Sequence, residues 1–184
     1  DRGELMTFIR SITRSGRRNK DTWMGKRCMV DMLELVKRYY YLPETNGSNS
    51  LKYVLPATLN ASTALQKKYT QPVYGAEEGI RSCNFSDWQW IQRENGKIID
   101  PYQLLPRMFT DATDETQELI SDDSELRDGG AAMVAYARTQ YEEMGEYERK
   151  HIFEALRKYC ELDTMAMVML YEGWVDLIKQ AKEN

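Results

Sequence analysis

The chain has 184 residues with a formal net charge of −4, and 29% of its residues are charged while 42% are hydrophobic. These values are ordinary for a soluble globular protein, and the lack of an ~18–20-residue apolar run or a signal-peptide pattern predicts no membrane partner. Three widely spaced cysteines without a CxxC pair indicate reduced thiols in a cytoplasmic protein and argue against a zinc site, and a single histidine argues against chemistry that needs several imidazoles.

The N-terminal part is basic, whereas the rest of the chain is acidic. Apolar residues at helical spacing predict a helix over residues 4–14, which Ser15-Gly16 ends. A basic loop follows, and its cations are Arg14, Arg17, Arg18, Lys20, Lys26 and Arg27. Such a cluster can contact the phosphates of a nucleic acid, although a solvated loop is the more common explanation. Because the chain starts within a helix-like pattern, we expect it to be a piece of a longer protein.

Short elements are predicted next. Residues 28–30 are apolar and predict a strand, and Asp31 is placed to cap the helix after it. The buried face of that helix would consist of Met32, Leu35, Val36 and Tyr39. Ser50 is placed to cap another short helix, which we expect Pro56 to stop, and a further helix is predicted over residues 61–69.

Residues 70–128 are predicted to form an irregular insertion with one regular element. Asn95-Gly96 lies between two apolar runs, which is a strong signal for a β-hairpin. Residues 111–128 are acidic and predict a solvated loop. The aromatic residues Tyr39-Tyr40-Tyr41, Trp88 and Trp90 could stack on nucleic-acid bases, but packing in the core or around the hairpin is the more common role.

Two helices are predicted at the C-terminal end. The first starts at Gly129-Gly130 and runs to about residue 144, and Gly145 separates it from a long helix over residues 148–182 with a hinge near residues 162–164. The chain is therefore predicted to be mainly α with a small β-hairpin, and to form a single partial domain over residues 1–184.

The long helix carries a carboxylate within an apolar stripe. Steps of three and four residues place one set of side chains on the same face: Ile152, Leu156, Tyr159, Asp163, Met167, Leu170, Trp174 and Leu177. Because burying an unpaired carboxylate is costly, Asp163 needs a partner, which could be a metal ion, a backbone N–H group or a base. Tyr159 lies one turn earlier and would share the pocket that Asp163 faces.

Tyr159 and Asp163 match the Tyr-x-x-x-Asp spacing of the third motif of tyrosine-type DEDD exonucleases. On spacing alone, the more common explanation is that Asp163 caps a new helix segment and Tyr159 packs in the core. Two longer stretches, residues 36–41 with 46–57 and residues 155–168, resemble the bacterial domain-of-unknown-function 2779 family. That family is itself similar to DEDD-type 3′–5′ exonucleases.

The resemblance implies that the chain is the C-terminal portion of an α/β ribonuclease-H-like exonuclease fold that acts on DNA or RNA. In such a site four carboxylates bind two Mg²⁺ or Mn²⁺ ions, which stabilise the attacking and leaving oxygens. Asp163 would be a metal ligand and Tyr159 would orient the water. The basic loop would then supply contacts to the phosphates.

The sequence departs from this pattern in the acids that should come first. Asp123-Ser124-Glu125 is an Asp-x-Glu pair, but it lies in the acidic loop, and Asp31 is better explained as a helix cap. We therefore expect this fragment to be inactive alone, to require the remainder of its own longer chain, and to be prone to self-association. The alternative is a non-catalytic helical interaction module or nucleic-acid-binding module.

Overall fold

The computed structural model describes residues 1–16, 21–105 and 127–183. The chain divides into two compact units, Asp1–Tyr40 and Tyr41–Asn184. Both units are helical, and the described strands form one two-stranded antiparallel hairpin. The prediction of a mainly α chain with a small β-hairpin is therefore confirmed. None of the helices in the described ranges combines the length and the apolar character needed to cross a membrane.

The first unit contains two helices, α1 (Arg2–Ile12) and α2 (Met32–Tyr39). Asp31 caps α2, because its carboxylate accepts hydrogen bonds from the N–H groups of Leu33 and Glu34 at 3.0 and 3.4 Å. A carboxylate at this position satisfies N–H groups that have no partner within the helix. The predicted capping role of Asp31 is confirmed, and its carboxylate is committed to that role.

Two predictions for the first unit are wrong. Residues 28–30 join no strand in the part of the chain that the structure describes, and the Met29 N–H instead donates to the Ile12 carbonyl at 3.0 Å. Tyr39 is 78% exposed, and Val36 is the buried residue of α2. Met32 and Leu35, the other two residues of the predicted buried face, are half-buried.

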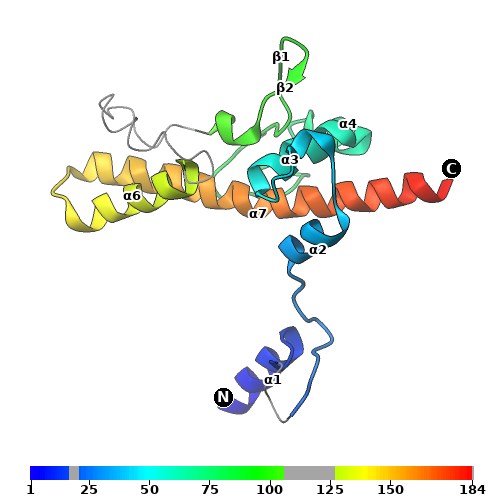
Figure 1. Cartoon of the computed structure of the whole chain (residues 1–184). Coiled ribbons are helices and arrows are strands. Elements are labelled where there is room, and N and C mark those ends of the chain that lie inside the picture. The colour runs from blue at the N-terminus through cyan, green and yellow to red at the C-terminus, as the bar shows by residue number, and fades with distance from the viewer. Residues whose placement is uncertain (17–20, 106–126, 184) are drawn as a thin grey trace. The chain divides into compact units, whose positions relative to one another are not determined.

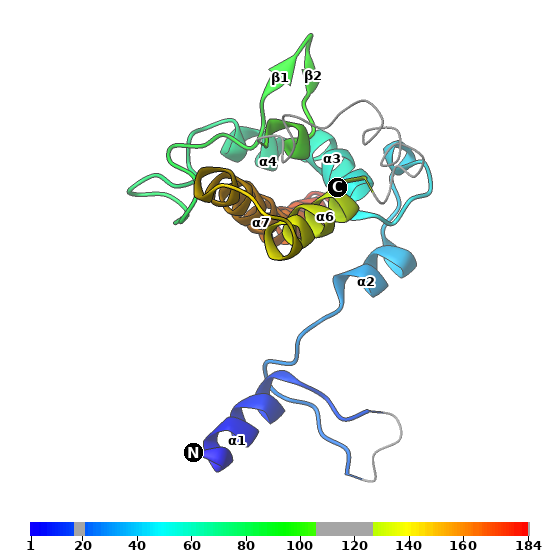
Figure 2. The ribbon, with the colours of Figure 1, turned by 90° about the vertical axis from the view of Figure 1, so that its left-hand side faces the viewer.

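The second unit is organised around one long helix, α7 (Glu146–Glu183), which runs unbroken through the predicted hinge. Helix α6 (Arg127–Tyr141) packs beside the first part of α7 (Figures 1 and 2). Helices α3 (Leu51–Ala61) and α4 (Thr63–Tyr69) pack on the later part of α7, and a short 3₁₀ helix, η1 (Pro43–Thr45), contacts α3. One helix therefore contacts all the larger elements of this unit.

The hydrophobic core lies where α3, α4 and α7 meet. Its most buried side chains include Val54, Leu55, Leu59, Leu65, Leu162, Ala166, Met169 and Leu170. Gly173 allows α7 to approach α3 closely, because a Cβ atom at this position would lie 2.5 Å from Cγ2 of Thr58. This core fixes the position of α3 along α7.

Helix α3 continues through Pro56 to Ala61, so the prediction that Pro56 stops this helix is wrong. A proline inside a helix removes one backbone hydrogen bond and costs about 3 kcal/mol. Leu55 and Leu59 on either side of it are fully buried, and each such side chain contributes roughly 1.5–3 kcal/mol. Packing of the helix on the core therefore offsets the cost of the proline.

The predicted hairpin is confirmed. Strand β1 (Arg93–Glu94) pairs with β2 (Lys97–Ile98), and Asn95 and Gly96 between them have positive φ angles of 50° and 80°. Both central residues of a type I′ turn need positive φ, which explains why this dipeptide favours the hairpin. The strands are short, and the residues before them have a different role.

Trp88 and Trp90 belong to an aromatic cluster rather than to a longer strand. Their rings lie 5.9 Å apart, and Phe85 lies 5.0 Å from Trp90. Trp90 is completely buried, and Tyr74 packs against it with ring centroids 5.2 Å apart. Trp90 is therefore a core residue, and its ring is not accessible to a base.

Candidate functional site

Tyr159 and Asp163 lie one turn apart on α7, next to a short 3₁₀ helix, η2 (Pro101–Leu104). Tyr159 is 9% exposed, whereas Asp163 is half-buried. Leu162 and Ala166, which are fully buried, mark the middle of the face that packs on the core. Asp163 therefore lies at the edge of the buried face.

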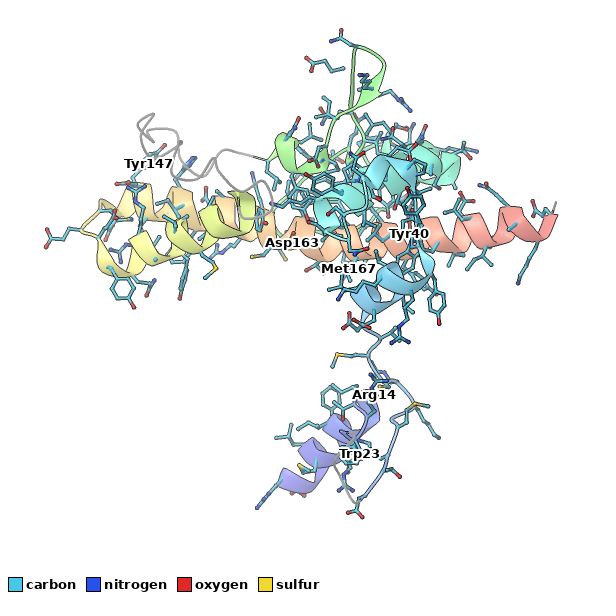
Figure 3. The ribbon with its side chains drawn as sticks, in the orientation of Figure 1. Arg14, Trp23, Tyr40, Tyr147, Asp163 and Met167 are labelled. Carbon is cyan, nitrogen blue, oxygen red and sulfur yellow. The ribbon has the colours of Figure 1, made fainter. Side chains whose placement is uncertain are left out.

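The apolar stripe predicted on α7 is rotated relative to the face that is buried. Met167 is a member of that stripe and is labelled with Asp163 in Figure 3. It is 36% exposed, whereas Met169 and Gly173, which lie outside the stripe, are buried. The difference arises because α3, α4 and α6 all pack on α7, so a single stripe does not describe its contacts. Asp163 is consequently less buried than the spacing predicts.

Among the described residues, Asp163 is paired with a phenol. The hydroxyl of Tyr102 donates a hydrogen bond to Oδ1 of Asp163 at 2.6 Å. Asp100 accepts a hydrogen bond from the N–H of Tyr102 at 3.1 Å, which caps η2 and fixes where its tyrosine points. A phenol was not among the partners that the sequence indicated, namely a metal ion, a backbone N–H or a base.

Tyr102 donates this hydrogen bond as a neutral phenol. Burial, and then the hydrogen bond to Asp163, raise the pKa of Tyr102 well above its ordinary value. Both effects disfavour a phenolate next to a carboxylate. Tyr102 therefore stays protonated, and its hydrogen bond holds the Asp163 side chain in one orientation.

Two further contacts complete the group. The rings of Tyr102 and Tyr159 lie 5.9 Å apart, and the ammonium of Lys52 lies over both, 5.4 and 6.0 Å from their centroids. We call Lys52, Tyr102, Tyr159 and Asp163 the tyrosine–aspartate cluster. It brings together three segments of the second unit, and only the two residues on α7 were predicted as a pair.

Tyr102 and Lys52 were missed because neither has a local signal of function. The Asp100-Pro101 dipeptide indicates a turn, and the structure has η2 there, but a turn signal does not reveal what the turn packs against. Lys52 lies within a stretch that supported the family resemblance, without a role of its own. Their meeting with α7 depends on the tertiary fold.

A second carboxylate of α7, Glu161, has a structural role. It accepts hydrogen bonds from the hydroxyl of Tyr74 at 2.7 Å, from the hydroxyl of Ser82 and from the side-chain amide of Asn84. Burial alone would raise the pKa of Glu161, but these hydrogen bonds outweigh it and hold the pKa below its ordinary value. Glu161 thus ties the loop around residues 74–84 to α7.

A two-metal site is not assembled by the described residues. Within them, no group of three or more His, Cys, Asp or Glu side chains is placed to hold a metal ion. Asp163 supplies one carboxylate, whereas a divalent cation takes several oxygen ligands, so the described residues hold only part of such a donor set. Asp123 and Glu125 lie outside the described residues.

The basic loop is only partly described. Arg17, Arg18 and Lys20 lie outside the described residues, while Lys26 and Arg27 are exposed in the first unit. The Arg27 N–H donates to the Ser11 carbonyl at 2.9 Å, so this stretch runs along the end of α1. Exposed cations are compatible with phosphate contacts and equally with a solvated loop.

Comparison with known proteins adds no relative: family models, curated proteins and solved structures were searched, and none matches the chain. The family membership inferred from residues 36–41, 46–57 and 155–168 therefore remains a prediction.

Proposed function

We propose that this chain forms the C-terminal part of a metal-dependent 3′–5′ exonuclease domain with a ribonuclease-H-like fold. The observation that carries the proposal is the tyrosine–aspartate cluster. A half-buried carboxylate is held in one orientation by Tyr102, next to Tyr159 one turn earlier on the same helix. A fixed carboxylate at the edge of a packed face is available to a cation that other residues help to bind.

In this proposal Asp163 is one ligand of the divalent cations and Tyr159 lies beside them. When bound, Mg²⁺ or Mn²⁺ supplies the positive charge that stabilises the oxygens of the phosphodiester. Tyr102 orients Asp163 through its hydroxyl. Because the described residues supply one carboxylate there, the other acids must come from elsewhere in the longer protein, and this chain alone should be inactive.

The experiment compares the longer parent protein with its Asp163→Asn and Glu154→Gln variants on end-labelled single-stranded DNA and RNA. An asparagine at 163 still accepts the Tyr102 hydrogen bond but loses the charge that binds metal. Glu154 is an exposed carboxylate on the same helix, paired only loosely with Lys150 at 3.9 Å, and serves as the control. We expect Mn²⁺- or Mg²⁺-dependent degradation to fall by about 100-fold or more in Asp163→Asn alone.

Equal activity of Asp163→Asn and the parent protein would contradict the proposal, and so would a folded parent that degrades neither substrate. Degradation by the present chain alone would contradict the expectation that it holds an incomplete site.

A second candidate, a helical interaction module, is favoured by apolar residues on the outer side of α7. Four of them are exposed by 36–62%: Met167, Val168, Tyr171 and Ile178. Such a patch on a helix is typical of an association surface. This candidate predicts that the chain sediments as a dimer, that Tyr171→Glu makes it monomeric, and that Asp163→Asn has no effect.

A further inference from the structure

The sequence contains two Asn-Gly dipeptides, and both lie in the same kind of turn. Asn46 and Gly47 have φ angles of 51° and 78°, and Asn95 and Gly96 have φ angles of 50° and 80°. All four residues are exposed. A Cβ atom on either glycine would meet nothing within 4 Å beyond the glycine's own chain neighbours. The two sites therefore match in sequence, in backbone conformation and in access to water.

An exposed Asn-Gly dipeptide is able to modify itself without an enzyme. The backbone nitrogen of the glycine attacks the side-chain carbonyl carbon of the asparagine and forms a new N–C bond, which closes a cyclic imide, the succinimide. The side-chain nitrogen takes up the proton of the glycine N–H and leaves as ammonia. Water then opens the ring at either carbonyl, which leaves aspartate or isoaspartate. Glycine favours the attack because it has no side chain to obstruct it.

The folded turn opposes this reaction. Asn46 has a ψ angle of 31°, which directs the nitrogen of the next residue away from the asparagine side chain. Ring closure needs that nitrogen on the same side as the side chain, so the backbone must first rotate out of the left-handed conformation. The reaction therefore proceeds from a locally opened turn, and its rate depends on how often that turn opens.

The turn at Asn46 is held by its surroundings. The Asn46 N–H donates to the Pro43 carbonyl at 3.0 Å, and the Ser48 N–H donates to the Thr45 carbonyl at 2.9 Å. Thr45 is 3% exposed, and η1, which ends at this residue, packs on α3. Opening this turn therefore disturbs a buried residue and the contact of η1 with α3.

The turn at Asn95 has weaker support. Strands β1 and β2 have two residues each, and three of these four residues are exposed. The hairpin projects from the helices of its unit in Figures 1 and 2. Strand β2 contacts α3, and Arg93 donates to the side chain of Gln66 on α4 at 2.7 Å. Because a two-stranded hairpin alone is at best marginally stable in water, this turn opens more readily than the turn at Asn46.

We propose that Asn95-Gly96 is a site of spontaneous succinimide formation, because the hairpin opens, and that the fold protects the identical dipeptide Asn46-Gly47. The conversion adds a negative charge beside Glu94. Isoaspartate also adds a methylene group to the main chain, in a turn whose two central residues need positive φ. The modified hairpin should therefore close less well. This inference is independent of the proposed nuclease function.

The test follows both sites in the same chain by peptide mapping and mass spectrometry, during incubation in mildly alkaline buffer. In the folded chain, aspartate and isoaspartate should accumulate about tenfold faster at position 95 than at position 46. In concentrated urea neither turn persists, and the two rates should become similar. The comparison in urea shows that the difference comes from the fold and not from the neighbouring residues.

A variant of the hairpin tests the cause of the difference. Arg93→Ala removes the hydrogen bonds from Arg93 to Gln66 and to the Gly96 carbonyl, so conversion at Asn95 should become about threefold faster. Conversion at Asn46 should not change. Arg81→Ala is the matched control, because Arg81 is an exposed arginine outside the hairpin, and it should leave both rates unchanged.

Equal rates at the two sites of the folded chain would overturn the proposal, and so would faster conversion at Asn46. An Asn95 that converts in urea but not in the folded chain would overturn it as well, since the hairpin would then protect its turn. An Arg93→Ala variant whose Asn95 converts at the original rate would contradict opening of the hairpin as the cause.

Discussion

Replacing Tyr102 with phenylalanine isolates the hydrogen bond that holds Asp163. The ring remains, so its packing on Tyr159 at 5.9 Å is kept, and only the 2.6 Å bond is lost. A hydrogen bond to a charged group contributes about 1.5–3 kcal/mol, and the lower part of that range applies because water can reach a half-buried carboxylate. We expect the free energy of unfolding to fall by about 1–2 kcal/mol.

Thermal melting followed by circular dichroism measures this change, which corresponds to a decrease in Tm of roughly 2–8 °C for a protein of this size. Tyr74→Phe is the matched control, since Tyr74 also donates from a buried phenol to a carboxylate of α7, Glu161 at 2.7 Å. Both variants should lose stability, but only Tyr102→Phe should also lower the nuclease activity that we propose for the longer protein. Equal activity losses in the two would refute a positioning role for Tyr102, and an unchanged Tm in Tyr102→Phe would refute the hydrogen bond itself.

Two further predictions concern the core and the buried phenols. Gly173→Ala should lower stability by about 1–2 kcal/mol, because its Cβ would lie 2.5 Å from a methyl of Thr58 whose hydroxyl is bound to the Val54 carbonyl. Gly3→Ala, a helical glycine with ordinary contacts, should lose nothing in the same melting assay. Burial raises the pKa of Tyr69 and other phenols, so above pH 10.0 the unfolded chain ionises first. Stability measured by urea titration should therefore fall as pH rises above 10, and a flat profile would contradict these assignments.

Local signals were sufficient where one or two residues determine the backbone. Asp31 caps α2 because a carboxylate at that point accepts from free N–H groups, and Asn95-Gly96 forms the hairpin turn because both residues adopt positive φ. The length of α7 also follows from its long run of helical spacing. In each case the information lies within a few residues of the element.

The end of α3 and the partner of Asp163 depend instead on tertiary contacts. Pro56 does not end α3, because burial of Leu55 and Leu59 outweighs its local preference. Asp163 was correctly singled out as a carboxylate that needs a partner, but Tyr102 lies 61 residues away and could not be found from spacing. Asp163 can bind a metal ion only where other acidic side chains lie close to it. A single sequence motif does not show which side chains those are.

The contacts that the carboxylates of α7 make affect how the chain folds during its synthesis. Glu172 accepts from Tyr69, 103 residues earlier, and Asp176 accepts from Ser62, 114 residues earlier. A ribosome adds about 5–20 residues per second, so α3 and α4 are complete roughly 5–20 s before the helix that buries them exists. During synthesis Leu55 and Leu59 have no partner from α7. Folding of this unit therefore has to wait until α7 has been synthesised, and aggregation or a chaperone can intervene in that interval.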